Sequence, residues 1–235
     1  MIPKVIHYCW FGNGPKSSKM QKCIASWKKY CPDYQIIEWN ESNFDVHQNA
    51  YLSWCYDQKK WAFFSDYARL LIIYEHGGIY FDTDVELVKR PDDLLRYEAF
   101  FGFENKENIN TGLGFGATAH QPMVAAMKTM YEKMTPDDEG NFNLIGCPKL
   151  NTEALLPFGL KKNGERQMLC GGIILPAEYL NPYDDPTGKL NITPQTISIH
   201  WYAKSWLSSS VVLRSKIMKP LHRILGTDAF ARFRK

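Results

Sequence analysis

One short segment constrains the fold of this chain most: two adjacent glycines, followed by two aspartates with one residue between them. Residues 77–87 read Gly-Gly-Ile-Tyr-Phe-Asp-Thr-Asp-Val-Glu-Leu. The glycines predict the end of a helix, and the residues after them predict a short strand that carries Asp82 and Asp84. Because side chains alternate faces at about 3.3 Å per residue, both carboxylates should share one side, their Cα atoms about 6–7 Å apart. Such a pair favours a Mg²⁺ or Mn²⁺ ion between its oxygens; the alternative is an ordinary solvated strand end.

The residues before the glycines predict a helix that is apolar on nearly every side. Eleven of the seventeen residues at 60–76 are aromatic or aliphatic and leave almost no polar face, and such a helix is buried on most sides. Asp66 and Arg69, three residues apart, lie on one narrow stripe of it. Buried charges are costly unless they are paired or bound to something. The pair is therefore either a structural ion pair or a ligand-facing group.

Further polar and aromatic residues come at the ends of other predicted strands. Trp10 ends the first strand, where open α/β sheets bind ligands, so it either stacks on a base or packs in the core. Asn110, in a glycine-rich segment, can face a polar ligand. A late strand delivers His200, which is either structural or a ligand, and Ser205 and Trp206 follow it in a cluster that suits a diphosphate.

Strands and helices alternate over the first half of the 235 residues. That pattern predicts an α/β domain with a mostly parallel central sheet flanked by helices. We expect this domain to span residues 1–207. The remaining residues, 208–235, hold seven Lys or Arg and one acid, and their spacing predicts a basic amphipathic helical tail. Such a tail favours peripheral membrane contact, the alternative being a helix packed on the domain with a solvated basic face.

Composition argues against other partners and compartments. The six cysteines form no Cys-x-x-Cys pair, which argues against a zinc site. The first residues lack the features of a secretion signal, and no apolar run reaches the about 18 residues of a membrane span. We therefore expect reduced thiols in a cytoplasmic protein. Nucleic-acid binding is not expected, because the basic residues gather in the tail, away from the aromatic residues.

Several of these segments together resemble one known family. Residues 65–69, Ser-Asp-Tyr-Ala-Arg, followed by residues 77–84, resemble the signature of the Asp-x-Asp "sugar-binding region" glycosyltransferases, glycosyltransferase family 32. That family includes yeast initiating mannosyltransferases, bacterial capsular and lipopolysaccharide transferases, and distant relatives of clostridial toxin domains. Residues 2–12 resemble its first strand and residues 200–206 its terminal motif. Residues 146–148, Gly-Cys-Pro, depart from a loop that often reads Thr-Gly-Pro.

The resemblance implies a GT-A fold, a Mn²⁺ or Mg²⁺ ion, and a retaining transfer from a nucleotide-diphosphate sugar, with a UDP-sugar favoured over a GDP-sugar. Together with the basic tail, the segment from Asp66 to Asp84 leads to the hypothesis that the acceptor is a glycan, in particular a lipid-linked capsular or surface polysaccharide precursor at the cytoplasmic face of the membrane. Asp82 would contact ribose and metal, and Asp84 would be the firmest metal ligand. The expected donor-binding residues are Trp10, Asp66, Arg69, Asp82, Asn110 and Trp206; the expected metal ligands are Asp82, Asp84, His200 and Ser205; and the expected catalytic residues are Asp66, Arg69, Asp82 and Asp84.

Two other classes of protein are alternatives. Residues 81–85 also resemble the first motif of haloacid-dehalogenase-type phosphatases, in which Asp82 would be the nucleophile. Those enzymes place the motif near their start, and they give no role to a buried pair such as Asp66 and Arg69. A non-catalytic carbohydrate-binding module would suit the aromatic residues but would also leave that pair unexplained.

Overall fold

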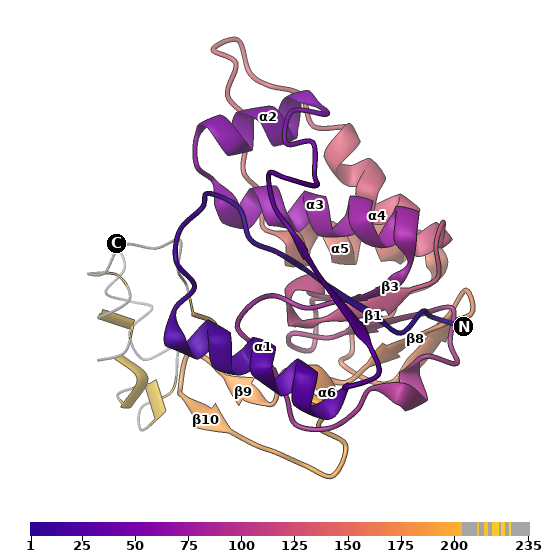
Figure 1. Cartoon of the computed structure of the whole chain (residues 1–235). Helices are drawn as coiled ribbons and strands as arrows, with labels where there is room; N and C mark the ends of the chain where they lie inside the picture. The colour runs from indigo at the N-terminus through magenta and orange to yellow at the C-terminus, as the bar shows by residue number, and fades with distance from the viewer. Residues whose placement is uncertain (204–210, 212–213, 216–217, 221, 224–225, 227–235) are drawn as a thin grey trace.

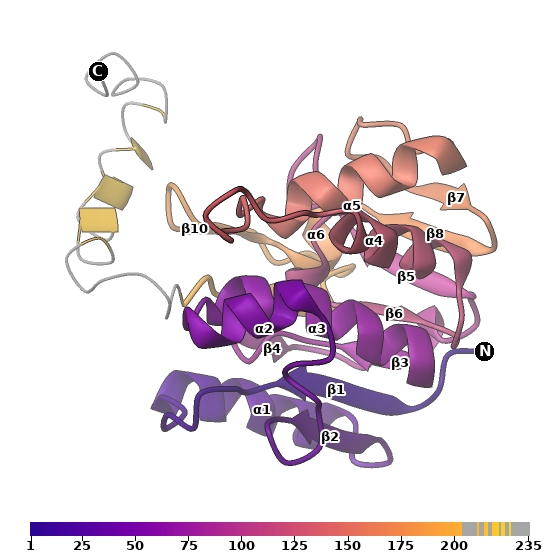
Figure 2. The same ribbon diagram turned by 90° about the horizontal axis from the view of Figure 1, so that it is seen from above.

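The computed structural model describes residues 1–203 and then residues 211, 214–215, 218–220, 222–223 and 226. A seven-stranded sheet forms its centre, with helices on both faces (Figure 1). In spatial order its strands are β2 (Gln35–Trp39), β1 (Val5–Cys9), β3 (Gly78–Tyr80), β6 (Phe115–Ala117), β5 (Ala99–Gly102), β8 (Gly172–Leu175) and β7 (Gln167–Leu169). Only β6 and β7 run against the others, so the predicted mostly parallel α/β sheet is confirmed; Figure 2 shows the strand order from above.

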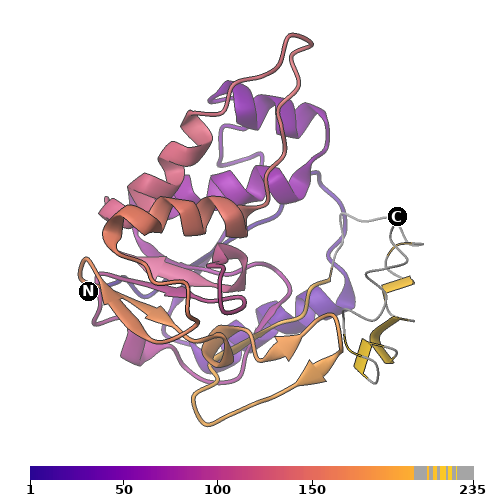
Figure 3. The same ribbon diagram turned by 180° about the vertical axis from the view of Figure 1, so that it is seen from behind.

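Six helices and four short strands complete the described part of the fold. The helices are α1 (Ser18–Tyr30), α2 (Ala50–Asp57), α3 (Trp61–His76), α4 (Pro122–Glu132), α5 (Cys147–Leu155) and α6 (Ala177–Leu180), with 3-10 turns η1 (Asp92–Leu94), η2 (Thr111–Leu113) and η3 (Leu156–Phe158). The short strands are β4 (Val85–Leu87), which pairs with β11 (Ser198–His200), and β9 (Tyr183–Asp184), which pairs with β10 (Lys189–Leu190). Figure 3, from behind, brings the later, orange strands to the front.

The sheet separates two hydrophobic cores. Helices α2 to α5 cover one face, and α1 and α6 lie on the other (Figure 1). Successive residues of a strand point to opposite faces: Phe101 packs into the α2–α5 core, whereas Phe100 packs with Trp27 of α1 in the other core. No helix among the described residues is long and apolar enough to cross a membrane.

Helix α3 and the glycines after it match their prediction. Most of α3 is buried, including Asp66 and Arg69. Gly77 and Gly78 have φ angles of +64° and +102°. A Cβ on Gly78 would lie 2.8 Å from Nε2 of His7, so only glycine lets β3 start this close to β1.

The prediction that one strand carries both aspartates is wrong. β3 ends at Tyr80, and Asp82 and Asp84 lie in a turn that the Val85 amide closes by donating to the Asp82 carbonyl at 3.0 Å. The chain leaves the large sheet at this point because β4 pairs with β11 instead. Helix α1 holds β4 in place, since Trp27 Nε1 donates to the Val85 carbonyl at 2.8 Å.

The expected tail, residues 208–235, lies mostly outside the described residues, and so do Ser205 and Trp206. The domain boundary and the amphipathic tail therefore stay predictions. One basic residue of the tail that is described, Lys219, contacts the β9–β10 region: its Nζ lies 2.9 Å from Oδ1 of Asp185 and donates to the Tyr183 hydroxyl at 2.7 Å.

Candidate active site

The carboxyl ends of β1, β3 and β5 meet at one edge of the sheet beside a cleft of about 550 Å³. Trp10 follows β1, Asp82 follows β3 and Glu104 comes soon after β5. The cleft gathers seven of the predicted residues: Trp10, Asp66, Arg69, Asp82, Asp84, Asn110 and His200. The sequence thus predicted which residues meet here, while their individual roles stay predictions.

Arg69 joins two of the acids. Its Nη2 lies 2.9 Å from Oδ1 of Asp66 and 3.1 Å from Oδ1 of Asp82, and its Nε donates to the Ser65 carbonyl at 3.0 Å. The guanidinium also lies over the Tyr80 ring, 4.9 Å from its centroid. Nη1 is buried without a hydrogen-bond partner among the described residues. Asp66 and Arg69 thus form the expected ion pair, and both line the cleft; a ligand-facing role for them stays a prediction.

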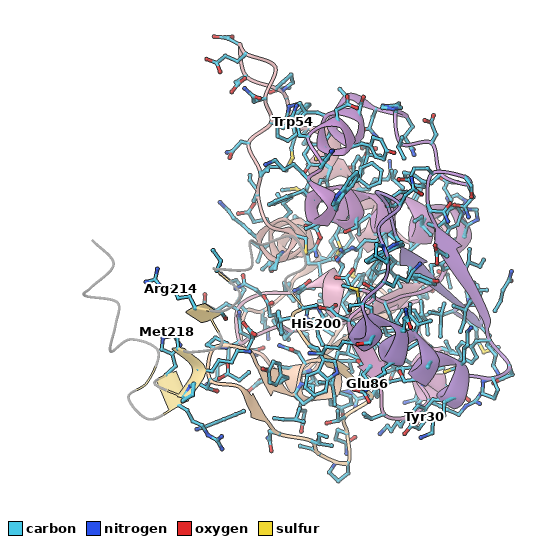
Figure 4. The ribbon with its side chains drawn as sticks, turned by 60° about the vertical axis from the view of Figure 1, so that its left-hand side comes forward. Tyr30, Trp54, Glu86, His200, Arg214 and Met218 are labelled. Atoms are coloured by element: carbon cyan, nitrogen blue, oxygen red, sulfur yellow. The ribbon has the colours of Figure 1, made fainter. Side chains whose placement is uncertain are left out.

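The second aspartate is bound differently. Oδ1 of Asp84 lies 3.2 Å from Nε2 of His200, and its Oδ2 accepts the Ala203 amide at 2.6 Å. Asp82, Asp84 and His200 each present a ligand atom, and these atoms lie within 4.8 Å of one another. Figure 4 shows His200 in the interior of the molecule, whereas Arg214 and Met218 lie at its edge.

The surroundings shift the pKa values of Asp82 and Asp84 in opposite directions. Burial raises the pKa of Asp82 to about 6, although Arg69 opposes that rise. Burial alone would also raise the pKa of Asp84, but the charge of His200 and its hydrogen bond outweigh burial and lower the pKa to about 2. Burial would lower the pKa of His200, and the charge of Asp84 raises it instead. Asp84 and His200 thus form a charged pair, whereas the pKa of Asp82 stays above its ordinary value.

Glu104, Tyr202 and Cys147 are among the lining residues that the predicted site residues did not include. Oε1 of Glu104 accepts hydrogen bonds from Asn110 Nδ2 at 3.1 Å and from the Tyr202 hydroxyl at 3.0 Å. Cys147 starts α5, and its thiol donates to Oδ1 of Asn110 at 3.4 Å. Burial raises the pKa of this thiol well above its usual value, so it stays neutral. A carboxylate just after an apolar strand, as at Glu104, was the signal available in the sequence.

Trp10 lines the cleft at its β1 side. Its Nε1 donates to the Gly14 carbonyl at 2.7 Å, and Nζ of Lys16 lies 5.2 Å from its ring centroid. The indole is half-buried. Trp10 packs against the core on the α1 side and also lines the cleft, so its stacking on a base stays a prediction.

Comparisons with known proteins agree with this geometry. Residues 17–101 match the family described as "Glycosyltransferase sugar-binding region containing DXD motif". The chain is 27% identical over 142 residues to inositol phosphoceramide mannosyltransferase 3 of Schizosaccharomyces pombe, covering 55% of this chain and 37% of that protein. It is 26% identical over 218 residues to an uncharacterised glycosyltransferase of Acanthamoeba polyphaga mimivirus, covering 88% and 84%. The chain thus spans less than half the length of the yeast relative.

A solved structure has the same fold. The structure titled "PaToxG Glycosyltransferase" superposes with a TM-score of 0.51 at 22% identity, covering 66% of this chain and 69% of that one. With the sheet described above, this likeness confirms the expected GT-A type of α/β fold. Over residues 17–101 the chain is thus similar to the glycosyltransferases with a DXD-containing sugar-binding region, and its fold agrees with that likeness.

Proposed function

We propose that this chain is a metal-dependent glycosyltransferase that moves a sugar from a nucleotide-diphosphate sugar to a glycan acceptor, with retention of configuration. The observation that carries the proposal is the meeting of Asp82, Asp84 and His200 with the Asp66–Arg69 pair in one cleft. Neither a phosphatase nor a binding module accounts for that cluster as well. In particular, Oδ1 of Asp82 is already shared by Arg69 and the Tyr80 hydroxyl, which does not suit a nucleophile.

The donor set fits a divalent cation. Two carboxylates and one imidazole lie within 4.8 Å of one another, and Mn²⁺ and Mg²⁺ favour oxygen-rich sites of this kind. Nδ1 of His200 is buried and has no hydrogen-bond partner among the described residues. We infer that Asp82, Asp84 and His200 hold the ion. When bound, it supplies positive charge that stabilises the departing diphosphate.

The chain's own residues position the donor around this site. Trp10 offers a flat apolar surface for the base at the β1 side. Arg69 is already fixed by Asp66 and Asp82, so its charge is in place before the donor binds, which is how preorganised groups stabilise developing charge. Asp66 presents a carboxylate to donor hydroxyls. Among the described lining residues, the Cys147 thiol is held neutral and Asp82 is engaged by Arg69 and Tyr80, which supports attack and departure on the same face of the sugar.

One yeast relative supports the proposals for donor and acceptor. It is named inositol phosphoceramide mannosyltransferase 3. That name supports a lipid-linked or surface-glycan acceptor for this chain, and it keeps a GDP-sugar as an alternative donor to the UDP-sugar favoured above. We also propose peripheral contact with the cytoplasmic face of the membrane through residues 208–235, supported by their seven basic residues.

Thermal-shift measurements with UDP- and GDP-sugars, each with and without Mn²⁺, test the central proposal. A nucleotide sugar should raise the melting temperature only when Mn²⁺ is present. Asp84→Asn should remove that dependence, because the variant loses a ligand charge at the metal site. If no nucleotide stabilises the wild-type protein in a metal-dependent way, the proposal fails.

The membrane proposal has its own test. Wild-type protein and a variant with its tail lysines and arginines changed to glutamine are compared for sedimentation with anionic liposomes. Each basic residue near an anionic surface contributes about 1 kcal/mol, so the variant should bind far more weakly. Equal binding of the two would overturn the membrane role and leave the transferase proposal untouched.

A further inference from the structure

Glu104 is held at a fixed place on the rim of the cleft. It comes soon after β5, where the bridge between Phe103 and Ile109 closes a short loop. The Glu104 amide donates to the Asn108 carbonyl at 2.8 Å, and the Asn110 amide donates to the Gly102 carbonyl at 3.2 Å. Glu104 and Asn110 thus stand side by side where the loop begins and ends, on backbone that hydrogen bonds hold in place.

Only one oxygen of the Glu104 carboxylate, Oε1, accepts hydrogen bonds from described residues. Its Oε1 accepts from Asn110 Nδ2 at 3.1 Å and from the Tyr202 hydroxyl at 3.0 Å. Over the part of the chain that the structure describes, no Lys, Arg or other donor is recorded on Oε2. Two uncharged donors orient this group, and the residue lines the cleft. Oε2 is therefore an oriented acceptor at the cleft surface.

The order of the strands places Glu104 at one end of the cleft. Across the sheet edge the order is β1, β3, β6, β5, with neighbouring strands about 4.8 Å apart. Trp10 therefore lies on one side of Asp82, one strand away, and Glu104 lies on the other side, two strands away. Tyr202 links Glu104 to the metal cluster, because its ring centroid lies 4.1 Å from that of His200.

The parts of a nucleotide sugar are joined in one order: base, ribose, diphosphate and sugar. With the base at Trp10 and the diphosphate at Asp82 and Asp84, the sugar extends toward β5. A sugar presents several hydroxyl donors, and a carboxylate accepts from a hydroxyl in a hydrogen bond stronger than one between neutral groups. On the basis of the proposed function, we propose that Oε2 of Glu104 binds a hydroxyl of the transferred sugar and that Asn110 and Tyr202 orient it.

The test compares binding of a nucleoside diphosphate with binding of the same nucleotide carrying its sugar. Wild type, Glu104→Gln and Glu107→Gln are titrated calorimetrically, with Mn²⁺, against UDP, UDP-glucose, UDP-galactose, GDP and GDP-mannose. Gln at 104 keeps the size and one carbonyl oxygen for Asn110 and Tyr202, but its amide nitrogen cannot accept a hydroxyl. Glu107 lies on the same loop and is exposed, so its variant is the matched control.

Glu104→Gln should weaken binding of the sugar-bearing ligand about tenfold or more and leave the affinity for the bare diphosphate within twofold of wild type. Glu107→Gln should match wild type for every ligand. Tyr202→Phe, which removes one of the two donors to Oε1, should give an intermediate loss confined to the same ligand, and it decides the question if Glu104→Gln does not fold.

Two results would overturn this inference and leave the proposed function standing. One is equal affinity of wild type and Glu104→Gln for the nucleotide sugar. The other is an equal loss of affinity for the nucleoside diphosphate and for the nucleotide sugar in Glu104→Gln. The first would mean that no donor-sugar hydroxyl meets Glu104, as when the carboxylate serves the acceptor instead. The second would mean that it supports the metal or nucleotide. A wild-type protein that binds none of the five ligands would instead overturn the proposed function, and this inference with it.

Discussion

His7 should make the stability of this protein sensitive to mild acid. The side chain is 1% exposed, on β1 beside the start of β3. Its Nδ1 lies 3.0 Å from the indole Nε1 of Trp39, and because an indole nitrogen only donates, Nδ1 must accept and the ring proton is on Nε2. A second proton could go only to Nδ1, where it would break this hydrogen bond. Burial, together with the charge of nearby His76, lowers the pKa of His7 to about 4.

The size of the effect follows from proton linkage. The unfolded chain binds a proton at His7 below about pH 6.5, whereas the folded protein does not until about pH 4. The unfolded state therefore holds more protons across this window, and the free energy of unfolding falls as the pH falls. Between pH 8 and pH 5 the loss that His7 contributes is about 2 kcal/mol.

Urea denaturation at pH 8 and pH 5 measures this loss. Wild type should lose about 2 kcal/mol more than His7→Gln between the two pH values, because all other titrating groups are shared and the cost of the substitution itself cancels. The exposed His47, changed to Gln, is the matched control for removing an imidazole. Equal losses in wild type and His7→Gln would refute the assignment of a neutral, buried His7.

Three further outcomes follow from the site and its surroundings. Asp84→Asn should weaken Mn²⁺ binding at least tenfold by calorimetry, since an ionised ligand becomes neutral, and unchanged binding would place the ion elsewhere. A Cβ on Gly112 would lie 2.6 Å from Oδ2 of Asp82, so Gly112→Ala should displace that carboxylate and reduce nucleotide affinity about tenfold or more; an unaltered affinity would show that Asp82 is not needed where it stands. Of the six free cysteines only Cys170 is exposed, so a thiol reagent should modify one group rapidly in the native protein, and Cys170→Ser should remove that fast phase.

The sequence predicted those elements best whose structure follows from a strong local pattern. Helix α3 was predicted over 60–76 and spans Trp61–His76, because its apolar residues leave no face for solvent and two glycines with positive φ end it. The cleft residues on α3 and after β1 and β3 followed from that, since parallel strands bring their carboxyl ends together. For this reason the sequence predicted that one cleft contains Trp10, Asp66, Arg69 and Asp82.

Contacts between residues far apart in the chain could not be predicted from the sequence. The turn at residues 82–84 exists because β4 pairs with β11, more than a hundred residues later, and no local pattern announces that partner. The support of Glu104 by Tyr202 likewise joins residues 98 positions apart. Such contacts depend on the complete topology, so a strand was predicted where the chain turns and a lining carboxylate was missed.

The turn also changes what the two aspartates can do. In one strand they would have shared a face and the same surroundings, and only a cation would have relieved their repulsion. In the turn, Asp82 reaches Arg69 and Asp84 reaches His200, so each acid has its own positive partner before any metal arrives. If the proposed ion binds here, it would compete with His200 for Asp84, and metal binding would then be tied to the release of a proton from that imidazole, as metal sites with histidine ligands require.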